Sequence, residues 1–164
     1  MSSSTTPSSV GMQLRRLLAF LDLAEGDCRL LPLTGVTGFI PEASNCHLNV
    51  IIQSQLAGGR AAFGWLLWED RASGICQAMF HSVRIDDAGL CFDITPRVDA
   101  ERLVMFVPDA TRRIALFGGA ERAIIFGYDN LCARPGRVLT GLTHTRYAVP
   151  ADISRRYGLA QLPH

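Results

Sequence analysis

Hydrophobic residues along the chain recur with two spacings, one typical of helices and the other typical of strands. The apolar positions of the first helical stretch lie three or four residues apart: Leu14, Leu17, Leu18 and Leu21. This spacing predicts an amphipathic helix that begins at Met12 and is stopped by Gly26. Residues 152–157 predict a short C-terminal helix that ends at Gly158.

A second helix is predicted to begin at Cys46. Apolar residues recur after it with helical spacing, and the Gly58-Gly59 pair closes the stretch. Ser44 and Asn45 directly precede it, and both residue types favour a helix N-terminus because their side-chain oxygens accept from free backbone N–H groups. The thiol of Cys46 is therefore expected in the first helical turn.

Shorter apolar runs predict five strands, at residues 61–68, 75–84, 90–94, 102–107 and 123–126. Residues 29–33 fit either a strand or an extended lead-in. Because helices come first and strands follow in a run, this order predicts an α+β fold. In it, the helix that bears Cys46 packs on an antiparallel sheet.

The chain is predicted to form one domain with a short tail. Residues 1–10 are rich in Ser and Thr and hold little that burial would stabilise, so a disordered tail is expected there. Residues 11–164 form the single predicted domain, which is long enough to bury a core. A Ser/Thr-rich leader without acidic residues also fits an effector that bacteria inject into host cells, and this alternative stays open beside a cytoplasmic location.

Charge and composition exclude several kinds of partner. The formal net charge is +1, and all 16 basic residues are Arg, dispersed along the chain, so nucleic acid is not an expected partner. No apolar stretch approaches the roughly 18 residues of a membrane span, so no membrane partner is expected. The absence of Lys excludes a lysine nucleophile. The sequence predicts no oligomeric state.

The cysteines indicate reduced thiols rather than a disulfide framework. Their number is odd and none forms a CxxC pair: Cys28, Cys46, Cys76, Cys91 and Cys132. A reducing cytoplasm fits this pattern best. Cys46, His47, His81 and Asp93 are ligand types that can bind zinc, but the adjacent Cys-His pair would have to turn both side chains to one point. We therefore predict neither a metal nor a cofactor.

Cys46 is the candidate nucleophile, because the first turn of a helix favours the thiolate and offers a free backbone N–H group to an oxyanion. Asn45 is a second candidate donor, although capping the helix is an equally good role for it. A thiol also needs a base. His47 is adjacent to Cys46 on the helix, where successive side chains diverge by about 100°, and His164 ends the chain. His81 and His144 remain.

His81 lies within a predicted strand, and the loop that follows it predicts the position of Asp93. Residues 86–89, Asp-Asp-Ala-Gly, are typical of a type I turn with Gly in the left-handed position. That loop pairs residue 83 with residue 93, which brings Asp93 to the same face as His81 and within reach of its imidazole. A two-residue loop would put the two side chains on opposite faces.

The run Phe80 to Pro96, FHSVRIDDAGLCFDITP, resembles the core of transglutaminase-like and papain-like cysteine enzymes, with the nucleophile upstream at a helix start. Residues 44–110 also resemble a group of uncharacterised bacterial proteins, some of which carry a SEC-C metal-chelating tail that is absent here. Shared features are NCHLNV at residues 45–50, GW at 64–65, WE at 68–69 and FVPD at 106–109. The resemblance implies Cys46 as nucleophile, His81 as base and Asp93 as the residue that orients the imidazole.

The resemblance leaves the substrate open, since its members include proteases, amidases, deamidases, crosslinking enzymes and inactive binders. We predict a thiol-dependent enzyme that acts on an amide or acyl group of a peptide or protein. Trp65, Trp68 and Gln77 are candidate substrate-binding residues together with Asn45. Gln77 and Gln53 stand in for the oxyanion Gln of papain-like enzymes, which has no counterpart at residues 35–45. A binding module that uses a Trp65/Trp68 groove is the alternative.

Overall fold

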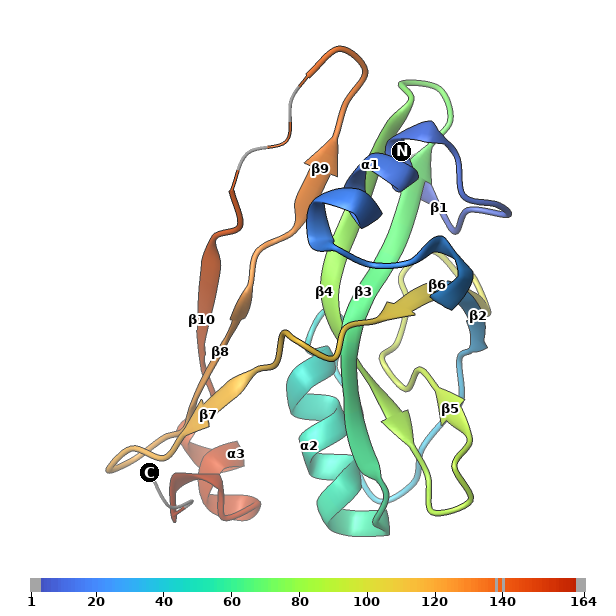
Figure 1. Ribbon diagram of the computed structural model, residues 1–164. Coiled ribbons are helices and arrows are strands. Elements are labelled where there is room, and N and C mark those ends of the chain that lie inside the picture. The colour runs from blue at the N-terminus through green and yellow to red at the C-terminus, as the bar shows by residue number, and fades with distance from the viewer. Residues whose placement is uncertain (1–3, 138, 140, 162–164) are drawn as a thin grey trace.

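The computed structural model describes residues 4–137, 139 and 141–161. This part of the chain contains two antiparallel sheets and three α-helices (Figure 1). The helices are α1 (Met12–Leu21), α2 (Cys46–Ala57) and α3 (Ala151–Arg156), and single 3-10 turns lie at Glu25–Asp27 and Leu159–Gln161. The predicted α+β class, with a helix on an antiparallel sheet, is confirmed at this level.

The larger sheet forms the centre of the molecule. Its strands lie in the order β2 (Arg29–Pro32), β6 (Leu103–Pro108), β3 (Arg60–Asp70), β4 (Ile75–Ile85) and β5 (Cys91–Phe92). Two short strands extend it, β1 (Ser4–Thr5) beside β3 and β9 (Leu131–Ala133) beside β4. The smaller sheet has the order β10 (His144–Ala148), β8 (Ile124–Tyr128) and β7 (Ala115–Phe117).

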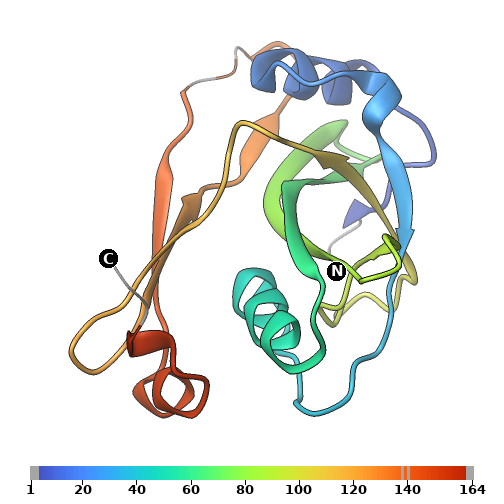
Figure 2. The ribbon, with the colours of Figure 1, turned by 60° about the horizontal axis from the view of Figure 1, so that its bottom comes forward.

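The larger sheet curls until its two ends meet, which Figure 2 shows as a ring of strands seen from one end. A parallel bridge joins Leu33 after β2 to Asp93 after β5. The backbone N–H of Asp93 donates to the carbonyl of Pro32 at 3.0 Å, and that of Thr34 donates to the carbonyl of Asp93 at 2.8 Å. The ring encloses one apolar cluster: Leu31, Leu66, Val83, Val104 and Phe106.

Two helices cover the outside of this ring. The apolar side of α1 packs against outward-facing side chains of β3 and β4, among them Trp65, Leu67 and Phe80. Helix α2 lies between the larger sheet and the smaller one (Figure 2), and its Leu48 and Ile52 pack against Ile125 of β8. Because α2 is held from both sides, its first residue has a fixed position relative to β4.

The predicted elements differ from the structure mainly at their ends. Helix α2 begins at Cys46 as predicted, but α1 ends at Leu21, five residues before Gly26, with Asp22 in the left-handed conformation as its cap. The strand predicted at 90–94 pairs with β4 only through Cys91 and Phe92. Four strands were not predicted, β1, β7, β9 and β10, because the first three are short and β10 is exposed along its whole length.

The predicted disordered tail is wrong for the residues that the structure describes. Ser4 and Thr5 pair with Asp70 and Glu69 at the end of β3, and Glu101 accepts from the backbone N–H of Thr6. Strand β3 extends beyond its pairing with β6, in which Leu67 is its last paired residue, so the backbone groups of β3 are available at this end. Pairing of a free strand edge needs no apolar side chain, which is why composition did not indicate it. Residues 1–3 lie outside the described residues.

Replacing Leu17 by Ala should destabilise the domain by about 2–5 kcal/mol, because Leu17 is 0% exposed in the cluster between α1 and the sheet. Met12→Ala is the matched control in the same helix, since Met12 is 72% exposed and its loss should cost no more than about 0.5 kcal/mol. Urea unfolding followed by circular dichroism measures both. Equal losses would mean that α1 is not docked on the sheet.

Candidate active site

The site lies where strand β4 has an unpaired stretch on one edge. On that edge β9 pairs with residues 76–78 and β5 pairs with residues 84–85. Among the described residues no strand pairs with residues 79–83 there. The start of α2 is fixed at this stretch, since Nδ1 of His47 lies 2.6 Å from Oγ of Ser82. Cys46, the first residue of the helix, is thereby brought to His81.

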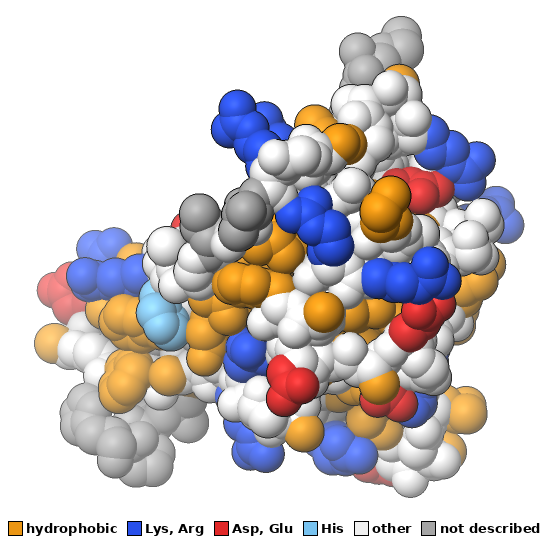
Figure 3. All heavy atoms as spheres, turned by 45° about the horizontal axis from the view of Figure 1, so that its top comes forward, with side chains coloured by type: hydrophobic (Ala, Val, Ile, Leu, Met, Phe, Trp, Pro, Cys, Tyr) orange, Lys and Arg blue, Asp and Glu red, His pale blue; other side chains and the backbone are white. Residues whose placement is uncertain are grey.

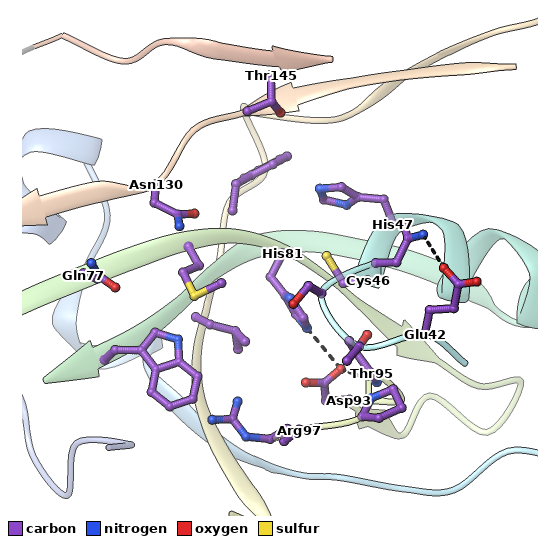
Figure 4. A pocket seen from close by; sticks show the side chains of 18 of the residues that line it. Glu42, Cys46, His47, Gln77, His81, Asp93, Thr95, Arg97, Asn130 and Thr145 are labelled. Carbon is purple, nitrogen blue, oxygen red and sulfur yellow. Dashed lines mark hydrogen bonds and ion pairs between the residues drawn. The ribbon is translucent and has the colours of Figure 1, made fainter. Parts of the chain in front are cut away.

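His81 and Asp93 form a buried hydrogen-bonded pair. Nε2 of His81 lies 3.0 Å from Oδ1 of Asp93, and the two residues are 5% and 1% exposed (Figure 4). The predicted hairpin register is confirmed, because Arg84 pairs with Phe92 and Ile85 with Cys91, which puts residue 83 opposite residue 93.

The loop that fixes this register has the predicted geometry. Gly89 adopts a φ of +83°, in the left-handed region that the predicted turn requires. The backbone N–H of Asp86 donates to the carbonyl of Leu90 at 3.0 Å, and that of Gly89 donates to the carbonyl of Asp86 at 3.0 Å. The odd-length loop is therefore what brings Asp93 to the face of His81.

Further hydrogen bonds fix the carboxylate and tie it to α2. Oδ1 of Asp93 also accepts from the backbone N–H of Thr95 at 3.0 Å. The Nδ2 group of Asn49, a buried residue of α2, donates to Oγ1 of Thr95 at 3.3 Å and to the carbonyl of Glu42 at 2.8 Å. Asn49 thus connects the helix that carries Cys46 to the turn that carries Asp93.

The electrostatics favour a thiolate at Cys46 and an imidazolium at His81. Burial would raise the pKa of Cys46, but the charge of His81, with hydrogen bonds from His47 and His81, holds this pKa well below its ordinary value. Burial would lower the pKa of His81, but the Cys46 thiolate and the Asp93 carboxylate raise it to about 10. Since Nε2 of His81 is bound to Asp93, Nδ1 is the ring nitrogen that can exchange a proton with the thiol.

The pKa of Asp93 is also shifted in favour of its charged form. Burial would raise the pKa of Asp93, but the charge of His81 and hydrogen bonds from His81 and Thr95 lower it. Three other cysteines behave in the opposite way, since burial raises the pKa of Cys28 and Cys91 and raises that of Cys76 to about 11. Among these four thiols the environment therefore singles out Cys46.

A cavity of about 890 Å³ opens beside Cys46, His81 and Asp93. Part of its wall consists of cross-strand neighbours on the face of β3 and β4 that carries His81: Leu66 opposite Met79, and Trp68 opposite Gln77. The guanidinium of Arg97 lies 3.9 Å from the ring of Trp68 and pairs with Asp99. Tyr128 and Thr145 of the smaller sheet also line the cavity. The cavity has the size of a small-molecule or side-chain site.

The structure brings Trp68 and Gln77 to the cavity but not Trp65. Trp65 is 0% exposed in the cluster beneath α1, and its Nε1–H donates to Oδ2 of Asp109 at 3.0 Å. The prediction that it lines a substrate groove is therefore wrong. Residues three apart on a strand face opposite sides of the sheet, so Trp65 and Trp68 could not share one groove.

Asn45 precedes α2 as predicted, but its side chain does not cap the helix. Instead its Nδ2 group donates to Oε2 of Glu42 at 3.1 Å and to the hydroxyl of Tyr147 at 3.0 Å. Asn45 also lines the cavity. Gln53, the other stand-in for an oxyanion Gln, is buried on α2 and does not line it.

The sequence did not predict His47 as a site residue. Its imidazole lines the cavity beside Cys46 and helps to lower the pKa of that thiol (Figure 4). His47 was set aside as a base because neighbouring side chains on a helix diverge. In the structure, the hydrogen bond to Ser82 turns its ring towards β4. His144 lies on exposed β10 with its ring 4.8 Å from that of Tyr128. His164 lies outside the described residues.

Several other properties bear on partners. On the face in Figure 3, Arg side chains are spread among acidic ones instead of forming a stripe. None of the described helices has the length and apolar character that crossing a bilayer requires. Within the described ranges, no three His, Cys, Asp or Glu side chains are arranged to hold a metal ion.

In comparisons with protein-family models, curated proteins and solved structures, no match to this chain was found.

The rate at which iodoacetamide alkylates Cys46 should stay nearly constant from about pH 7 to about pH 8.5. The upper limit is the pKa of an ordinary thiol. The rate is constant because the lowered pKa of Cys46 keeps it a thiolate throughout this range, and reactivity is lost only as pH falls through that lowered value. Cys28 is the internal control, because its raised pKa makes its rate increase about tenfold per pH unit. Peptide mass spectrometry after timed labelling measures both rates. A rate at Cys46 that rises in parallel with that of Cys28 would contradict the ion pair.

Proposed function

We propose that the chain is a thiol-dependent enzyme of the papain-like and transglutaminase-like kind that acts on an amide or related acyl group. The observation that carries the proposal is the buried His81–Asp93 bond of 3.0 Å beside a cysteine whose pKa is held low. A core that needed only packing would gain little from burying an imidazole and a carboxylate, since each loses solvation. Perturbed titratable groups that converge beside a cavity are typical of catalytic sites.

The proposed reaction proceeds in two stages. The Cys46 thiolate attacks the carbonyl carbon, a C–S bond forms, and the carbonyl electron pair moves to oxygen. As that pair returns, the bond to the leaving amine breaks, and Nδ1 of His81 gives the amine its proton. Water then attacks the thioester, His81 takes one proton from it, and the acid and the thiolate are released. Asp93 holds the imidazole through Nε2 in both stages.

The substrate class in this proposal is an amide of a peptide or protein, which includes amidase, peptidase and deamidase activity. Trp68, Gln77 and Asn45 are the proposed substrate contacts, because all three line the cavity with Cys46. We assign hydrolysis rather than amine transfer, since water is the default second nucleophile. We also propose a reducing compartment such as the cytoplasm, because all five cysteines are free.

Two alternatives have less support. A binding module was expected to use a groove formed by Trp65 and Trp68, and Trp65 is buried away from the cavity. An injected effector would carry a leader that serves only for translocation. Thr5 and Thr6 instead contact Glu101 in the domain, which favours a structural role for this segment.

The wild-type protein should release p-nitrophenolate from p-nitrophenyl acetate in a burst and become acetylated at Cys46. Cys46→Ser should abolish this acetylation, and His81→Ala should slow it by about 100-fold or more, because no positioned base or acid remains. Cys132→Ser is the control thiol and should keep the wild-type rate, since Cys132, on β9, does not line the cavity. Absorbance and intact-mass measurements follow the reaction. Acetylation spread equally over several cysteines, or unchanged by His81→Ala, would refute the proposed function.

A further inference from the structure

Attack on a carbonyl creates an oxyanion, and the described site lacks the side-chain donor that papain-like enzymes use for it. The backbone N–H of Cys46 lies in the first turn of α2 and is one donor. Gln53 lies seven residues further along the helix, about 10 Å away, and is buried. Gln77 lies four residues from His81 along β4, about 13 Å away. Neither glutamine is beside the sulfur.

His47 does lie beside the sulfur. Its imidazole helps to lower the pKa of the Cys46 thiol, and in Figure 4 its ring lies on the other side of Cys46 from Asp93. The two histidines therefore reach the thiol from different directions. His81 is buried and bound to a carboxylate, whereas His47 is half-buried and lines the cavity. One thiol needs only one base, so the second imidazole is free for another role.

The surroundings of His47 fix which of its nitrogens can face a substrate. Nδ1 lies 2.6 Å from Oγ of Ser82, a buried residue of β4, and the ring packs at 5.5 Å from that of Phe80. Nε2 lies beside Gly127 of β8, where an added Cβ would come within 3.5 Å of it and within 3.6 Å of Oγ1 of Thr145. Because Thr145 lines the cavity, Nε2 is the nitrogen on the cavity side.

We propose that His47 is a second catalytic histidine, whose Nε2–H donates to the substrate oxygen that becomes negative when the Cys46 thiolate attacks. This inference rests on the proposed function. In this proposal the Ser82 hydroxyl donates to Nδ1, which leaves the N–H of the ring at Nε2. Before the attack the same N–H group donates to the thiolate, and as the C–S bond forms it transfers to the oxygen. No proton leaves His47 in this step.

Two reactions of the Cys46 thiol distinguish donation to the oxyanion from an effect of His47 on the thiolate. Acylation by p-nitrophenyl acetate passes through an oxyanion, whereas alkylation by iodoacetamide does not. The ratio of the two rates therefore cancels any effect of a variant on the thiolate itself. His47→Ala should lower the acylation-to-alkylation ratio about 100-fold, the usual effect of removing one oxyanion donor. His47→Gln keeps an N–H donor and should retain at least about a tenth of the wild-type ratio.

His144→Ala is the matched control, because His144 is exposed and does not line the cavity, and its ratio should equal that of the wild type. Ser82→Ala tests the same inference without touching His47, since loss of the Nδ1 partner should also lower the ratio. It is the decisive variant if the His47 variants fail to fold, as judged by circular dichroism. An unchanged ratio in the folded His47→Ala or Ser82→Ala protein would overturn the inference, even where both rates fall together. Absence of acylation in the wild type would instead refute the proposed function.

Discussion

The hydrogen bond between the His81 imidazole and the Asp93 carboxylate is the interaction on which the site depends. Both groups are buried, and an unpaired charge in such a place would cost several kcal/mol. The pair is stable because each partner compensates the desolvation of the other and because Thr95 gives Asp93 a second donor. Three separate features of the fold hold the two residues together.

The first feature is the odd-length loop between β4 and β5, which turns Asp93 to the face of His81. The second is the bridge from Leu33 to Asp93, which closes the curled sheet at the residue that carries the carboxylate. The third is Asn49, which links α2 to Thr95. The position of the pair therefore depends at once on the register of the sheet, on the closure of the ring and on the position of the helix that carries the nucleophile. A change to any of the three should disturb the site.

Much of this site could be predicted from the sequence because its determinants are local. The helical spacing of the apolar residues predicts α2, although the side-chain cap expected from Asn45 does not form, and the side of the sheet on which Asp93 lies follows from four loop residues. The opposite faces of Trp65 and Trp68 were also predictable from strand periodicity, so that error was avoidable. The roles of Cys46, His81 and Asp93 that the resemblance implies stay a prediction.

The remaining features depend on contacts between distant parts of the chain. His47 reaches the thiol because Ser82, 35 residues away, holds its ring. Strands β1 and β10 form by backbone pairing with β3 and β8, and no apolar pattern in their own sequences marks them. The closure of the ring joins residues 33 and 93, which carry no sequence signal for each other. In each case the partner is found only once the whole fold has formed.

If Cys46 and His81 form an ion pair that Asp93 stabilises, a nitrogen NMR titration of the His81 ring will detect it. The imidazolium should persist far above the ordinary histidine pKa of about 6.5 and lose its proton near pH 10, and in Cys46→Ala the pKa of His81 should be much lower. A ring that titrates near 6.5 in both proteins would contradict this ion pair.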